Sequence, residues 1–148
     1  MRLLVTLFLS FTLTTACLAK CPAILAVYHH GETDKFSLTF SKQMQPKAWS
    51  NIEADLSFGK QRFKFEFTAS NGYPMNYLVS LDEKFNNSQE NSVLFFDKNL
   101  RALSLPQAGE AAPDYIVTPE LGLWLDRLQL KSNPLLPPGI WKLSGCKG

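Results

Sequence analysis

The sequence has few of the residues on which catalytic and metal sites most often depend. It contains two histidines, His29 and His30, and three cysteines among 148 residues. No G-x-S-x-G nucleophile elbow, phosphate-binding loop or dinucleotide-binding glycine motif occurs in it. These absences argue against the common hydrolases and nucleotide-dependent enzymes. We therefore expect a protein that is not an enzyme and that needs no cofactor.

A large excess of charge of one sign is also missing. Fifteen Lys and Arg residues stand against 13 Asp and Glu residues, for a formal net charge of +2. Nucleic-acid binders usually carry a concentrated basic patch. Basic residues do alternate with phenylalanines over 60–67, but alternation places the two sets on opposite faces of a strand. A stacking platform needs aromatic rings exposed beside the charges, so no nucleic-acid partner is expected.

Long hydrophobic runs are absent too. After Met1-Arg2, the segment 3–13 is apolar apart from Thr and Ser, and small residues follow up to Ala19. A membrane-spanning helix needs about 20 apolar residues, which this run does not reach. The pattern is typical of a secretory signal peptide over residues 1–19. The remainder, 20–148, suits a single domain, with no transmembrane segment expected in the mature chain.

The cysteines support export. Cys17 falls inside the predicted signal, which leaves Cys21 and Cys146 near the two ends of the mature chain. An even number of cysteines in an exported protein predicts a disulfide, and hence a periplasmic or secreted location. The alternative is a lipoprotein anchored through Cys17, because Ala16 precedes it as in lipidation signals. Against this, Thr14 stands where such signals usually carry an aliphatic residue.

The clearest structural signal lies in Ile52 to Thr68. Apolar and polar residues alternate on both sides of Gly59-Lys60, as in two half-buried strands joined by a tight turn. With a two-residue loop, Leu56 should face Phe63 on the apolar side. On the polar side, Asp55 should face Lys64, and Glu53 should face Glu66. Glycine in the first loop position suits a type II′ turn.

Further short strands are predicted on both sides of this hairpin. Phe36, Leu38 and Phe40 alternate with polar residues, and other short β-prone runs occur at 23–28, 77–81, 93–96 and 140–143. The tract Phe40-Ser41-Lys42-Gln43-Met44 resembles the Phe-Ser-Lys-x-Met tract of some bacterial immunoglobulin-like repeats. We therefore expect a mainly β, single-domain antiparallel β-sandwich, either immunoglobulin-like or a partly open barrel.

The segment near 119–130 is ambiguous. Thr118-Pro119-Glu120 has the residues of a helix start, and Leu121, Trp124, Leu125 and Leu128 would share one helical face. Gly122 and the alternating leucines also fit two short strand pieces. We favour one short helix.

Two weak candidate sites can be proposed from the residue types. His30, Glu32 and Asp34 share one side of an extended chain and could bind a metal, whereas a polar turn at a strand end is the simpler interpretation. Trp49 and Tyr73 fall in predicted loops and could stack on a glycan, although large aromatic rings are more often buried.

The hypothesis that these observations favour is a non-catalytic, exported interaction domain. Its partner would be a protein or another envelope component, bound through loop residues. The alternative is a small-ligand binder, with a glycan at Trp49 and Tyr73 or a metal at the His29–Asp34 turn.

Overall fold

The computed structural model describes residues 20–46, 49–72, 74–82, 90–128 and 135–148. The proposed signal peptide and Cys17 lie outside these residues. The chain is mainly β, as expected, with one α-helix in the described part. The elements in order are the 3-10 turn η1 (Ala23–Leu25) and then β1 (Ala26–His30), β2 (Thr33–Lys42), β3 (Ile52–Phe58), β4 (Gln61–Ala69), β5 (Asn76–Ser80), β6 (Asn91–Phe96), β7 (Ala102–Leu103), β8 (Tyr115–Val117), α1 (Leu121–Arg127) and β9 (Ile140–Cys146).

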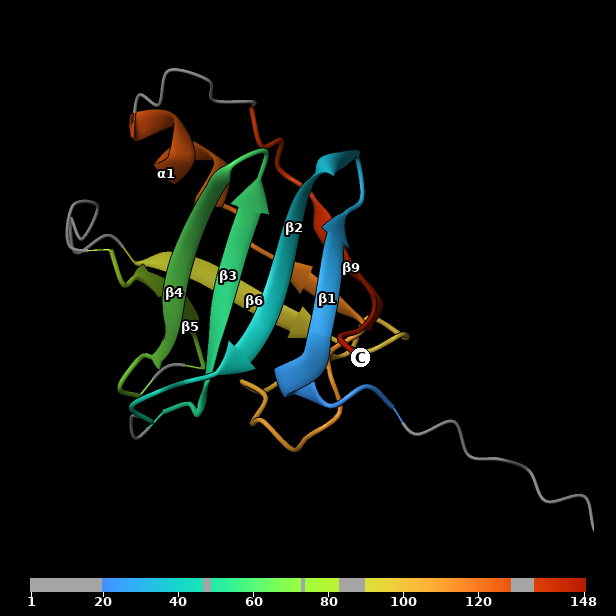
Figure 1. Ribbon diagram of the computed structural model, residues 1–148. Helices are drawn as coiled ribbons and strands as arrows, with labels where there is room; N and C mark the ends of the chain where they lie inside the picture. The colour runs from blue at the N-terminus through green and yellow to red at the C-terminus, as the bar shows by residue number, and fades with distance from the viewer. Residues whose placement is uncertain (1–19, 47–48, 73, 83–89, 129–134) are drawn as a thin grey trace, which may run out of the picture.

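The strands form a closed antiparallel barrel rather than a clear sandwich (Figure 1). The sheet order is β5-β4-β3-β2-β1-β9-β8-β6-β7, and an additional pairing of β5 with β6 closes eight strands into a ring. The short strand β7 pairs with the end of β6. The expectation of an antiparallel, mainly β domain is confirmed, but the strands do not clearly form two packed sheets, because β9 enters between β1 and β8 and the pairing of β5 with β6 closes the ring.

The hairpin of β3 and β4 has the predicted register. Leu56 pairs with Phe63, Asp55 with Lys64 and Glu53 with Glu66. Gly59 has a φ of +54°, a backbone conformation that glycine adopts without the steric cost of a Cβ. The alternation of side chains therefore fixed both the turn position and the face that points inward.

Aromatic side chains fill the barrel. Rings from neighbouring strands meet inside it, with centroids 5.1 Å apart for Tyr28 and Phe40, 5.2 Å for Phe40 and Phe67, and 5.8 Å for Phe67 and Phe95. All four residues are at most 1% exposed. An eight-stranded barrel has an interior just wide enough for side chains or for one small ligand, and these rings occupy it.

The antiparallel order gives the barrel two distinct ends. At one, which we call the helix end, the β3–β4 and β1–β2 turns lie with α1 (Figure 1). Trp124 of α1 packs on Phe63 and Phe65, with ring centroids 5.6 and 5.2 Å away. The predicted apolar helical face is confirmed, since Leu121, Trp124 and Leu125 are buried.

The start of this helix differs from the sequence-based expectation. Glu120 is the N-cap residue, with no side-chain capping bond, and Thr118 precedes the helix. The Thr118 hydroxyl instead accepts a buried hydrogen bond of 3.0 Å from Nε1 of Trp141 on β9. A buried indole N–H needs an acceptor, and satisfying it ties the approach to α1 to the barrel wall.

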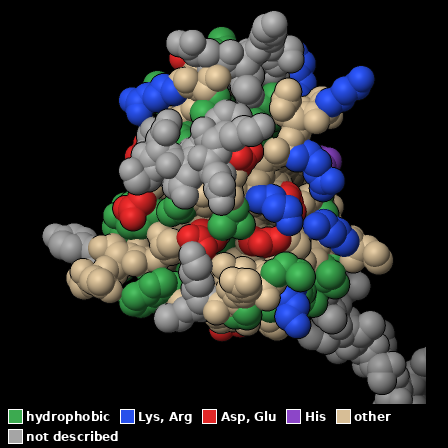
Figure 2. Space-filling model, turned by 60° about the vertical axis from the view of Figure 1, so that its left-hand side comes forward, with side chains coloured by type: hydrophobic (Ala, Val, Ile, Leu, Met, Phe, Trp, Pro, Cys, Tyr) green, Lys and Arg blue, Asp and Glu red, His purple; other side chains and the backbone are tan. Residues whose placement is uncertain are grey.

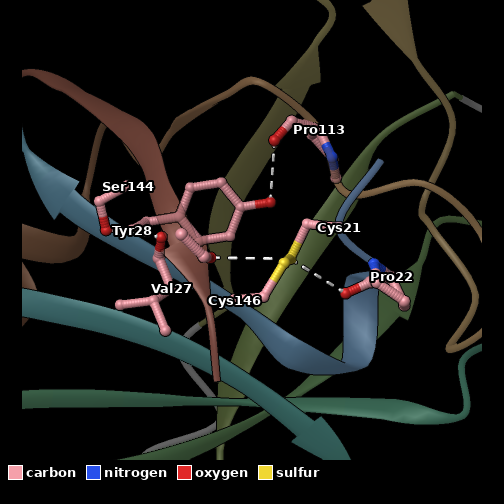
Figure 3. Close-up of a disulfide and its surroundings, with 8 residues drawn as sticks. Cys21, Pro22, Val27, Tyr28, Pro113, Ser144 and Cys146 are labelled. Carbon is pink, nitrogen blue, oxygen red and sulfur yellow. Dashed lines mark hydrogen bonds between the residues drawn. A yellow bond between two sulfur atoms is a disulfide. The ribbon is translucent and has the colours of Figure 1, made fainter. Parts of the chain in front are cut away.

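The opposite end, which we call the disulfide end, holds the predicted Cys21–Cys146 bond (Figure 3). The Cα atoms are 5.7 Å apart, and Cys146 pairs with Ala26 across β1 and β9. Beside the bond, the buried Tyr28 hydroxyl donates a hydrogen bond of 3.0 Å to the carbonyl oxygen of Pro113. The disulfide thus fastens the beginning of the described chain to the last strand.

Candidate functional site

The turn proposed as a metal site does not bring its three residues together. His30 is buried at 4% exposure and packs edge-on against Trp141, with ring centroids 5.1 Å apart. Glu32 and Asp34 are exposed. Within the described ranges, no three His, Cys, Asp or Glu side chains are grouped so that they could hold a metal ion.

His30 has the contacts of a structural residue. Its Nδ1 accepts a hydrogen bond of 3.3 Å from the Glu32 backbone N–H, and its ring lies against Gly139, where a Cβ would come within 2.6 Å of Cε1. Burial lowers the pKa of this imidazole, against smaller opposing effects of the Glu32 charge and a hydrogen bond to the Pro137 backbone. The side chain holds the β1–β2 turn to the loop that precedes β9.

Trp49, in the connection between β2 and β3 at the disulfide end, is displayed as the sequence suggested. It is 46% exposed, a large fraction for an indole. Tyr73, its proposed companion, lies outside the described residues.

Residues 49–51, at the β3 end of this connection, are held by hydrogen bonds. The Trp49 carbonyl oxygen accepts a hydrogen bond of 3.4 Å from Nε2 of Gln107, and Asn51 Oδ1 accepts one of 2.8 Å from the Ala108 N–H. The buried Ser50 hydroxyl accepts a further bond of 3.1 Å from the Ile52 N–H. The indole is therefore presented by a fixed backbone, which lowers the conformational entropy lost when a partner binds.

A shallow hollow lies at the same end of the barrel. It has a volume of about 380 Å³ and is lined by residues at the β4–β5 connection and by β7 with the residues after it: Ala69, Pro74, Met75, Asn76, Ala102, Leu103, Ser104 and Leu105. The segment that follows Leu105 also carries Gln107, which contacts Trp49. The connections at the disulfide end thus combine an exposed indole with a partly apolar hollow.

The outer wall of β3 and β4 holds a feature that the alternating pattern did not predict. Glu53, Asp55 and Glu66 point to the polar side of the hairpin, yet they are only 6%, 7% and 8% exposed. Figure 2 shows acidic side chains gathered on this side of the molecule, with Lys and Arg side chains beside them. The one signal of this in the sequence is the predicted pairing of Glu53 with Glu66 across the hairpin.

Lys64 forms an ion pair with this wall. Its Nζ lies 2.9 Å from Glu53 Oε1, and the Ser41 hydroxyl donates a weaker bond of 3.4 Å to the same oxygen. The hydrogen bond to Glu53, with the nearby charge of Asp55, raises the pKa of Lys64. The ammonium group therefore stays charged at any physiological pH.

The disulfide is the feature that bears on location. Disulfides persist in oxidising compartments, so the Cys21–Cys146 bond favours a non-cytoplasmic environment. Among the residues described, no helix is long and apolar enough to cross a bilayer.

Comparisons with protein-family models, with curated proteins and with solved structures found no match to this chain.

Proposed function

We propose that this protein is an exported, non-catalytic interaction domain that binds a protein or another envelope component at the disulfide end of its barrel. The observation that carries the proposal is Trp49, an exposed indole on an anchored backbone. Binding energy at protein interfaces is concentrated in a few residues, among which Trp is enriched. The neighbouring hollow offers a surface against which a partner segment could pack.

The filled interior supports binding at the exterior. Barrels that carry small molecules hold them inside the strand ring, where this chain places Tyr28, Phe40, Phe67 and Phe95 in mutual contact. The disulfide, together with the signal-like residues 1–19, supports a periplasmic or secreted protein.

Site-specific photo-crosslinking tests the proposal in the native compartment. A photoreactive phenylalanine analogue at Trp49 should form one discrete adduct. The same analogue at Leu135, which is 80% exposed near the helix end, should not form it. Equal adducts at both positions, or none at Trp49, would refute the proposed surface. Reproducible turnover in a hydrolase panel, abolished by one substitution, would refute the non-catalytic assignment.

The second candidate is a glycan-binding domain that uses the same indole. A half-exposed tryptophan can stack on the apolar face of a sugar ring. A glycan array separates the two functions, because a sugar-dependent signal lost in Trp49→Ala favours the glycan, whereas a protein adduct favours the interaction domain.

A further inference from the structure

The short strand β7 lies outside the ring of eight strands and pairs with β6 alone. The pairing of β6 with β8 takes up one edge of β6 along residues 94–96. β7 therefore lies on the other edge of β6, which it shares with β5. In the described part of the chain, no strand pairs with the far side of β7. We call this far side the β7 edge.

The hydrogen bonds of the β6–β7 turn show which backbone groups face the β7 edge. The Asp97 N–H donates a bond of 3.0 Å to the Arg101 carbonyl oxygen. Along an antiparallel strand, successive residues direct their backbone groups to opposite sides. Leu103, two residues after Arg101, therefore bonds toward β6, whereas Ala102 directs its N–H and C=O to the β7 edge. Among the described residues, no hydrogen bond reaches Ala102 from that side.

The hollow of about 380 Å³ borders the β7 edge. Residues 102–105 form one side of it, and the β4–β5 connection forms the other. Leu103 pairs with the buried Phe95, and directly opposite residues project to the same face of a sheet. Leu103 is nevertheless 40% exposed, since no strand lies beyond it. The β7 edge thus combines unpaired backbone groups, an apolar side chain and adjacent space.

An extended peptide has the chemistry that this edge lacks. Unpaired N–H and C=O groups of an edge strand are a template for pairing with another chain. A peptide that adds a strand satisfies them with its own backbone, and its alternate side chains enter the neighbouring pocket. Here the pocket is the hollow beside Leu103.

The charges beside β7 favour an acidic segment of another protein over a second copy of this chain. The turn from β6 to β7 carries Lys98 and Arg101 against Asp97 alone. The Asp97 carboxylate already accepts backbone N–H bonds of 2.8 and 2.9 Å from Asn99 and Arg101. Two copies joined at their β7 edges would bring the same cations together, and like charges across a strand pair repel.

We propose, resting on the function proposed above, that the β7 edge holds an extended acidic peptide segment of the partner protein as an added strand. One residue of the segment exchanges N–H···O bonds with Ala102. An apolar neighbour packs on Leu103 in the hollow, and an acidic neighbour lies opposite Arg101.

NMR titration of the whole exported protein with the peptide acetyl-Thr-Val-Thr-Glu-Thr-amide tests this pairing. Antiparallel to β7, its valine lies opposite Leu103, its central threonine opposite Ala102 and its glutamate opposite Arg101. The matched control is the same peptide N-methylated at the central threonine, which removes one backbone donor. Saturable amide shifts are expected at residues 101–105, and the N-methylated peptide should bind about tenfold more weakly.

Amide hydrogen exchange tests the edge itself. In the free protein, the Ala102 amide should exchange at nearly the rate of an unfolded chain, whereas the Leu103 amide should be protected by β6. The peptide, at about ten times its Kd, should slow exchange at Ala102 about tenfold.

A proline substitution makes the test specific. Ala102→Pro removes the N–H at the β7 edge, and proline is tolerated where an edge-strand N–H faces solvent. The variant should stay folded and bind the peptide about tenfold more weakly. Ala102→Val keeps the N–H and is the matched control, with native affinity expected. If Ala102→Pro does not fold, the N-methylated peptide makes the same comparison on the native protein.

The proposal is overturned if the Ala102 amide is already protected in the free protein, or if both peptides bind equally. Protection of Ala102 that rises with protein concentration alone would show a second copy at the edge and would also overturn it. The photo-adduct at Trp49 separates the two proposals. An adduct without peptide binding refutes the β7 edge alone, and peptide binding without an adduct refutes the Trp49 surface alone.

Discussion

Removing the Cys21–Cys146 bond should destabilise the barrel mainly through the unfolded chain. The bond closes a loop with a sequence separation of 125 residues. For a loop of that length, the chain-entropy model gives about 5 kcal/mol. In the folded state β1 and β9 stay paired without the bond, so most native contacts should survive. Single domains have total stabilities of about 5–15 kcal/mol, so the expected loss is a large share.

Urea unfolding of the native protein and of the double variant Cys21→Ala/Cys146→Ala measures this loss. With a slope near 2 kcal/mol per molar urea, the midpoint should fall by about 2.5 M. Ser144→Ala is the control, because it removes only the exposed hydrogen bond of 2.9 Å to the Val27 carbonyl oxygen at the same end. That change should cost less than about 1.5 kcal/mol. A double variant within about 1 kcal/mol of the native protein would refute the reasoning.

Three further predictions concern single positions. Leu100 has a φ of +61° in an exposed turn, a conformation that costs a residue with a Cβ more than it costs glycine. Leu100→Gly should therefore stabilise the protein by roughly 1 kcal/mol in thermal unfolding. A loss of stability would show that the leucine makes a needed contact. Gly122→Ala should destabilise by about 1–3 kcal/mol, because a Cβ there would lie 2.4 Å from the Leu136 carbonyl oxygen; an unchanged midpoint would contradict the close packing of α1. The pKa of His30 is lowered in the folded protein, so the unfolded chain binds the proton first as the pH falls. The contribution of neutral His30 to stability is therefore complete above the unfolded pKa of about 6.5 and is lost as the pH falls below it. Unfolding of His30→Gln across pH 5–7.5 should show a flatter profile than the native protein, and parallel profiles would rule this out.

The sequence predicted local structure well where periodicity and turn chemistry agree. Alternation around Gly59 defined the register of β3 and β4, and the spacing of Leu121, Trp124 and Leu125 identified the buried face of α1. The disulfide followed from cysteine number and position. These features depend on neighbours in the chain or on a count, which a single sequence contains.

Features that depend on distant pairings could not be predicted in the same way. Barrel closure requires β5 to pair with β6 and β9 to pair with β8, and no residue pattern in the single sequence states those partners. The helix start expected at Thr118 lies at Glu120 instead, and the Thr118 hydroxyl accepts a hydrogen bond from Trp141, far along the chain. The burial of the acidic side chains on the outer wall was missed for the same reason: alternation put Glu66 on a polar face, and only the assembled wall buries it.

The barrel is filled by its own aromatic side chains, and we propose that it therefore binds at its exterior. Titration with an environment-sensitive fluorescent fatty acid tests it most directly, since an open barrel interior would take up such a probe. We predict no saturable one-to-one binding by the native, disulfide-bonded protein. Stoichiometric uptake with blue-shifted emission, abolished by enlarging Ala54 within the barrel to Phe, would show that the interior is a ligand cavity and would contradict this account.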